Sequence, residues 1–117
     1  MPTMSKHLLS GCVNGKAITL TGTDTAGAVT IHQAVAGTSD HDEIFIYLVN
    51  TSASGVKVTI EWGETDADGH IEQTVDGEGG AYLAVPGFML QNGLLVKAFA
   101  GTADVISIHG RVHRTTA

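Results

Sequence analysis

Apolar and polar residues alternate with a period of two along almost the whole chain. The clearest case is the segment 56–62, in which apolar residues occupy every second position between Lys57, Thr59 and Glu61. Successive side chains of a β-strand point to opposite faces, so this pattern predicts a sheet with one dry face and one wet face. No stretch with the 3.6-residue apolar period of a helix interrupts it. The sequence therefore predicts an all-β protein.

Turn clusters rich in Gly, Asn and Asp separate the alternating segments, in line with 15 Gly and 2 Pro among 117 residues. About eight strands are expected, at residues 18–21, 29–35, 43–50, 56–62, 71–75, 81–85, 94–99 and 105–113. Short strands at this spacing are typical of an antiparallel β-sandwich or a jelly roll. We expect one such domain over residues 16–117, preceded by an N-terminal arm at residues 1–15.

Charge and cysteine content restrict the partners. The formal net charge is −6 with six Lys and Arg in total, which argues against nucleic acid and against an anionic membrane surface. A single cysteine, Cys12, excludes an internal disulfide. Residues 9–12 have the form of a lipoprotein cleavage box, but Lys6 and His7 stand where a signal peptide needs its apolar core. A protein or a neutral glycan is the expected partner.

Metal and calcium sites are not expected. Of six histidines, His109 and His113 share one strand face, but about 13 Å separates them at ~3.3 Å per residue. The acidic loop around Asp66 and Asp68 lacks the glutamate that an EF-hand requires at its twelfth position. It is interpreted as a polar hairpin loop.

No catalytic constellation stands out either. Ser52 and Ser54 lack the glycine pattern of a nucleophile elbow. Glu61 and Glu72 could face each other across a hairpin, but they are interpreted as two solvated strand carboxylates. The sequence predicts a protein without enzymatic activity and without a cofactor.

Two segments present apolar residues on both faces. They contain Phe45 and Tyr47 in the first case, and Phe88, Met89 and Leu95 in the second. Either these strands are covered on both sides within the chain, or the second side is buried against another subunit or partner, as exposed apolar patches often are. These five residues are therefore candidate interface residues.

The last strand is unusually basic for an acidic chain. His109, Arg111 and His113 on this strand and Arg114 directly after it point outward or trail at the C-terminus, and they include both arginines of the sequence. As a hypothesis, this strand docks against an acidic surface such as a loop of a neighbouring copy. The alternative is an edge strand whose charges prevent aggregation. These four residues complete the candidate interface.

Residues 49–60 and the closing half of the chain resemble segments of small accessory virion proteins of tailed phages. In the closing half the resemblance covers residues 85–90, Asn92-Gly93, 94–100 and 105–110, and in all it extends roughly over residues 43–113. It implies a β-sandwich or jelly roll that assembles on the phage particle as a capsid decoration (cement) protein, or at the neck or tail. No active-site residues carry over from it.

The resemblance also implies the partners and the location. The expected partner is the major capsid protein or another virion protein, and the expected assembly is a homotrimer. The protein would be located on the virion after synthesis in the bacterial host cytoplasm. The alternative function is a carbohydrate-binding module, although such modules display aromatic residues, and most of the six here are expected at inward or ambiguous positions.

Overall fold

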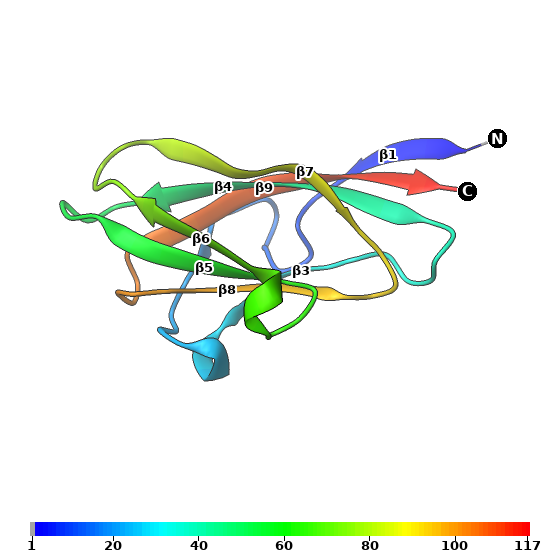
Figure 1. Cartoon of the computed structure of the whole chain (residues 1–117). Helices are drawn as coiled ribbons and strands as arrows, with labels where there is room; N and C mark the ends of the chain where they lie inside the picture. Colours follow the sequence, from blue (N-terminus) through cyan, green and yellow to red (C-terminus); the bar gives the residue numbers. More distant parts are fainter. Residues whose placement is uncertain (1) are drawn as a thin grey trace.

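The computed structural model describes residues 2–117 and consists of two antiparallel sheets packed face to face (Figure 1). The strands are β1 (Thr3–His7), β2 (Ile18–Thr19), β3 (Val29–Gln33), β4 (His41–Asn50), β5 (Val56–Trp62), β6 (His70–Val75), β7 (Ala81–Leu90), β8 (Leu95–Ala100) and β9 (Ile106–Thr116). Two short 3-10 turns, η1 (Thr25–Gly27) and η2 (Ala67–Gly69), lie outside the second sheet.

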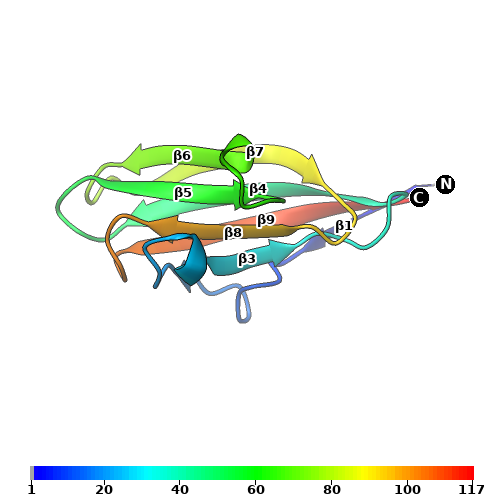
Figure 2. The ribbon, with the colours of Figure 1, turned by 60° about the horizontal axis from the view of Figure 1, so that its bottom comes forward.

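The strand order is that of a jelly roll. The first sheet runs β1-β9-β4-β7, with β2 also paired to β9, and the second sheet runs β3-β8-β5-β6. Most connections pass from one sheet to the other, as Figure 2 shows from a second direction. Two interleaved four-stranded rows of this kind are the double Greek key of jelly rolls. The expected β-sandwich is confirmed. It has nine strands instead of eight because two short strands, β1 and β2, both pair with the same side of β9 at the edge of the first sheet.

The core between the sheets is aliphatic. On β4, Ile44, Ile46 and Leu48 are fully buried, and they alternate with residues that face away from the second sheet. On β5, Val58 and Ile60 point inward to meet them. The alternation seen in the sequence is therefore the alternation between core and outer face. Burial of such side chains supplies the main stabilising free energy, at roughly 25 cal/mol per Å² of apolar surface.

Most of the expected N-terminal arm is built into the domain. Residues 3–7 form β1, which pairs with the end of β9 from Thr3 opposite Thr116 to His7 opposite Val112. Leu9 is buried in the core, and the Gly11 amide donates to the Ile31 carbonyl. The side chains of β1 remain largely exposed, so its residues show only a weak apolar pattern. Backbone hydrogen bonds to β9, and not buried side chains, hold this strand in the sheet. The two chain ends consequently lie side by side (Figure 1).

Two strands, β7 and β9, extend three or more residues past their predicted C-terminal ends. β9 continues to Thr116 because β1 and β4 provide ladder partners on both of its sides. β7 continues through Pro86 to Leu90, with register shifts opposite β4. A proline is tolerated here because β7 is an edge strand of its sheet. No helix in residues 2–117 has the length and apolar character needed to cross a membrane.

The division between core and outer face can be tested by truncation. Leu48→Ala, at a fully buried position, should lower the free energy of unfolding by about 2–5 kcal/mol through lost burial and a residual cavity. Leu83→Ala on β7, whose side chain is 41% exposed, should cost less than about 1 kcal/mol. Urea unfolding measures both, and equal losses would contradict the assignment of faces.

Candidate protein-binding face

The outer face of the first sheet turns away from the core and is not overlaid by any other part of residues 2–117 (Figure 1). On β4 it presents Glu43, Phe45 and Tyr47, which are half-buried between neighbouring strands. Residues opposite each other in the ladder share a face. The residues thus added are His109, Arg111 and His113 from β9, Leu83 and Met89 from β7, and Lys6 from β1. We call this set the outer face.

Phe45 and Arg111 form the centre of the outer face. The Arg111 guanidinium carbon lies 4.3 Å from the centroid of the Phe45 ring, a cation–π arrangement. Arg111 Nε also donates to Nε2 of His113 at 3.3 Å, and the His113 ring lies 5.0 Å from Phe45. Gly87 on β7, at φ +100°, leaves room for the aromatic ring, since an added Cβ would lie 3.1 Å from it. The result is an aromatic and cationic patch.

The structure brings together six of the nine candidate interface residues. They are Phe45, Tyr47, Met89, His109, Arg111 and His113, all on the outer face. Leu95 lies on β8 of the other sheet, on its own outer side, where it alternates with buried Val96. Phe88 is opposite the core residue Ile44, on the inner side of β7, and meets Trp62 edge-on at 6.0 Å. The remaining residue, Arg114, also points inward.

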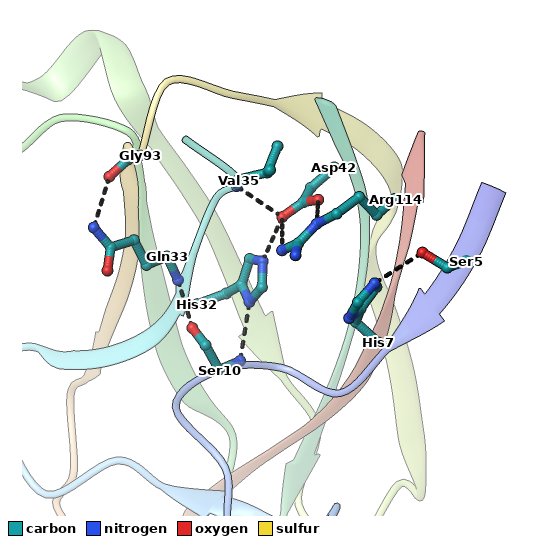
Figure 3. Close-up of polar contacts among 9 residues, drawn as sticks. All are labelled: Ser5, His7, Ser10, His32, Gln33, Val35, Asp42, Gly93 and Arg114. Carbon is teal, nitrogen blue, oxygen red and sulfur yellow. Dashed lines mark hydrogen bonds and ion pairs between the residues drawn. The ribbon is translucent and has the colours of Figure 1, made fainter. Parts of the chain in front are cut away.

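Arg114 belongs to a buried polar cluster and not to the basic surface (Figure 3). Its Nε donates to Oδ1 of Asp42 at 2.7 Å, and its Nη2 donates to Oδ2 at 3.1 Å. Asp42 is completely inaccessible to solvent. Such a two-point pair matches the planar guanidinium to the carboxylate and is the strong form of the ion pair. The expectation that Arg114 belongs to the exposed basic surface together with Arg111 is therefore wrong.

His32 completes this cluster from β3. Its Nε2 lies 2.8 Å from Oδ2 of Asp42, and its Nδ1 lies 2.9 Å from the backbone nitrogen of Ser10. The amide of Ser10 can only donate, so Nδ1 accepts and the ring proton of the neutral imidazole resides on Nε2, from which it is donated to Asp42. The amide of Val35 also donates to Asp42, at 3.0 Å.

Burial and pairing shift the pKa values of the cluster. Burial lowers the pKa of His32 below its ordinary value of 6.5, and this outweighs the opposing effect of the Asp42 carboxylate. Burial alone would raise the pKa of Asp42, but hydrogen bonds from Arg114 and His32 outweigh it and lower that pKa. The Asp42 carboxylate in turn raises the pKa of Arg114. The folded cluster is thus a charged Asp–Arg pair with a neutral histidine.

Sequence reasoning did not identify this cluster. A signal for Asp42 was available in the alternation of β4. Asp42 stands two residues before Ile44 and so shares its inward face. No comparable local signal identifies Arg114 as its partner, which lies 72 residues away.

The second sheet also corrects an expectation. Glu61 and Thr59 were expected on a wet face, but they are only 1% and 3% exposed. Thr25 of η1 reaches Glu61 from the outer side of the sheet, and its Oγ1 donates to Oε2 of Glu61 at 3.0 Å. Glu61 pairs with His70 in the ladder, and not with Glu72.

The Ser10, His32 and Asp42 side chains are not arranged as a nucleophile with its base. Ser10, His32 and Asp42 come together, but the serine meets the imidazole through its backbone amide, while its hydroxyl accepts from the Gln33 amide. This geometry does not activate the hydroxyl as a nucleophile, since the base does not contact it. Within residues 2–117, no three His, Cys, Asp or Glu side chains gather as metal ligands would.

No protein-family model and no curated protein matches this sequence. Among solved structures, a chain in the structure of the Gx strain of infectious bursal disease virus matches with a TM-score of 0.50 and 16% identity, over 99% of this chain and 33% of that one. A chain from particles derived from infectious bursal virus matches with a TM-score of 0.48 and 10% identity, over 98% and 32%. The chain spans about a third of the length of these structures, and the likeness concerns the fold.

The two arginines should differ sharply in their effect on stability. Arg114→Gln leaves the buried Asp42 carboxylate without its ion-pair partner and should destabilise the fold by about 3–5 kcal/mol. Arg111→Gln, at an exposed position, should cost less than about 1 kcal/mol. Denaturant unfolding compares them, and similar losses would rule out the structural role of Arg114.

The lowered pKa of His32 predicts a pH effect on stability. Below pH 6.5 the unfolded chain protonates this residue while the folded chain does not, so stability falls as the pH drops toward the lowered value. The contribution of Asp42 is lost only at more acid pH, through its own lowered pKa. Between about pH 7 and pH 5, the melting temperature of His32→Gln should therefore fall less steeply than that of the wild type. Parallel curves would contradict this expectation.

Proposed function

We propose that this chain is a non-enzymatic structural protein of a virus particle, and specifically a decoration protein on a phage capsid. In this proposal the outer face of the first sheet binds the major capsid protein or another virion protein. The outer face carries the proposal: it is an aromatic and cationic patch on a chain of net charge −6, presented by a sheet whose other side is already used as core. Aromatic residues and arginine are enriched in protein–protein interfaces.

Three observations support the virion role. The fold is a jelly roll, an architecture used by viral capsid domains. A chain in the structure of infectious bursal disease virus shares that fold over nearly all of this chain. Residues 43–113 resemble accessory virion proteins of tailed phages in their order of apolar strands and turns. We further propose a homotrimer, made in the bacterial cytoplasm, with neither nucleic acid nor membrane as its partner.

A carbohydrate-binding function is the second candidate, favoured by one observation. Most of the six aromatic residues were expected at inward or ambiguous positions, yet the buried aliphatic core contains none of them, and Tyr82 is 47% exposed. Its side chain borders a small depression that Gln73 and Asp76 also line. Screening on a glycan array separates the two candidates, because the virion role requires no glycan.

Charge reversal on the outer face tests the virion role. Purified heads that lack this chain, from the virus whose genome encodes it, are mixed with recombinant protein and sedimented. Arg111→Glu should reduce co-sedimentation at least tenfold, because it removes the exposed cation over Phe45. Lys57→Glu makes the same charge change on the outer side of the second sheet, at a residue 57% exposed, and should bind as the wild type does.

Light scattering on the free protein measures the proposed trimer in parallel. A monomer that does not sediment with the heads would overturn the proposal. So would equal binding of the Arg111→Glu and Lys57→Glu variants, because the contact would then not involve the outer face.

A further inference from the structure

Glu61 is a buried carboxylate with only one of its oxygens satisfied. It lies on β5, on the outer side of the second sheet, and is 1% exposed. Its Oε2 accepts from the Thr25 hydroxyl at 3.0 Å, whereas its Oε1 has no hydrogen-bond partner within residues 2–117. Leaving a buried carboxylate oxygen unpaired is costly, and native structures rarely do so without a reason.

No neighbouring cation resolves this. His70 Nε2 lies 3.5 Å from Oε2 of Glu61, but its shorter contact is to the Thr65 carbonyl, at 3.1 Å. Lys97 stands directly opposite Glu61 in the ladder with β8, yet no ion pair joins the two in the described chain. Oε1 is therefore left without a donor among the described residues.

Glu61 lines a depression of about 310 Å³ on the surface of the second sheet. Leu94 and Leu95 form an apolar wall of the depression and are 43% and 37% exposed. Glu64 and Lys97 line it as well, so that two carboxylates and one ammonium group border the same space. The depression is therefore apolar on one side and predominantly acidic on the other.

A ligand that fits this space carries a positive charge on an aliphatic stem. Lysine and arginine side chains have this form, since they lay their methylene groups along apolar surface and project the charged end. The cationic end supplies the donors that Glu61 needs, and a guanidinium can also reach a second carboxylate through its fork of donors. A purely apolar ligand would leave Oε1 unpaired, and an anion would meet two carboxylates.

We propose that this depression on the second sheet is a binding site for a lysine or arginine side chain of a partner protein. The stem packs on Leu94 and Leu95, and the cationic end donates to Glu61 with Glu64 beside it. The site lies on the opposite side of the sandwich from the outer face. It therefore does not depend on the proposed virion role, and the failure of either proposal leaves the other unaffected.

The test uses N-acetyl-arginine amide as the probe and the full ¹⁵N-labelled chain as the receptor. Saturable chemical-shift changes are expected at the amides of Gly63, Thr65 and Gly93, which line the depression. N-acetyl-citrulline amide, which has nearly the same shape without the charge, should bind at least tenfold more weakly. Glu61→Gln should weaken arginine binding to the same extent. Glu72→Gln, a more exposed carboxylate on the adjacent strand β6, is the matched control and should bind as the wild type does.

Three results would overturn the proposal. These are the absence of saturable shifts up to millimolar probe, equal binding of the arginine and citrulline probes, and equal affinity of the Glu61→Gln and Glu72→Gln variants. Should Glu61→Gln fail to fold, the comparison of arginine with citrulline on the wild-type chain still decides the question. Binding that responds equally to both substitutions would indicate a diffuse acidic surface and no defined site.

Discussion

The Asp42 carboxylate has no contact with solvent, and the arrangement of one end of the sandwich follows from the need to satisfy it. A buried charge without partners is prohibitively costly, so the fold brings donors to it from three separate segments. Arg114 comes from the end of β9, His32 from β3, and the Val35 amide from the link between β3 and β4. Through His32 the same cluster also holds the Ser10 backbone, and with it the segment that follows β1.

This cluster explains why the two arginines near the C-terminus have different roles. Arg114 points inward and neutralises Asp42, whereas Arg111, three residues earlier, points outward over Phe45. Because a strand alternates its faces at every residue, an odd spacing places one guanidinium on the inward side of β9, against Asp42, and the other on the outer face. Arg111 provides a positive charge on the outer face. The Asp42–Arg114 ion pair lies at the end of the sandwich where β1, β9 and β4 meet.

Sequence reasoning succeeded where a property depends on local alternation. It predicted the β-sandwich and the apolar character of both sides of β4. It failed where the burial of a residue or the pairing of a strand depends on a segment far away in the sequence. Glu61 obeys the alternation of β5, yet it is buried, and Thr25 of η1 contacts it from the side that was expected to be wet. β1 has almost no buried side chains, so its place in the sheet depends on backbone pairing with β9, which leaves no pattern in its residues.

The amino-acid sequence by itself determined the class of fold, because a period of two in apolar residues can bury one face only as a sheet. It also determined that one strand is apolar on both sides, since that is visible within a single segment. Only the tertiary structure decided which charges are inside. Whether Asp42, Arg114 or Glu61 is solvated depends on segments tens of residues away, and the free energy of a buried charge depends on those partners and not on its sequence neighbours.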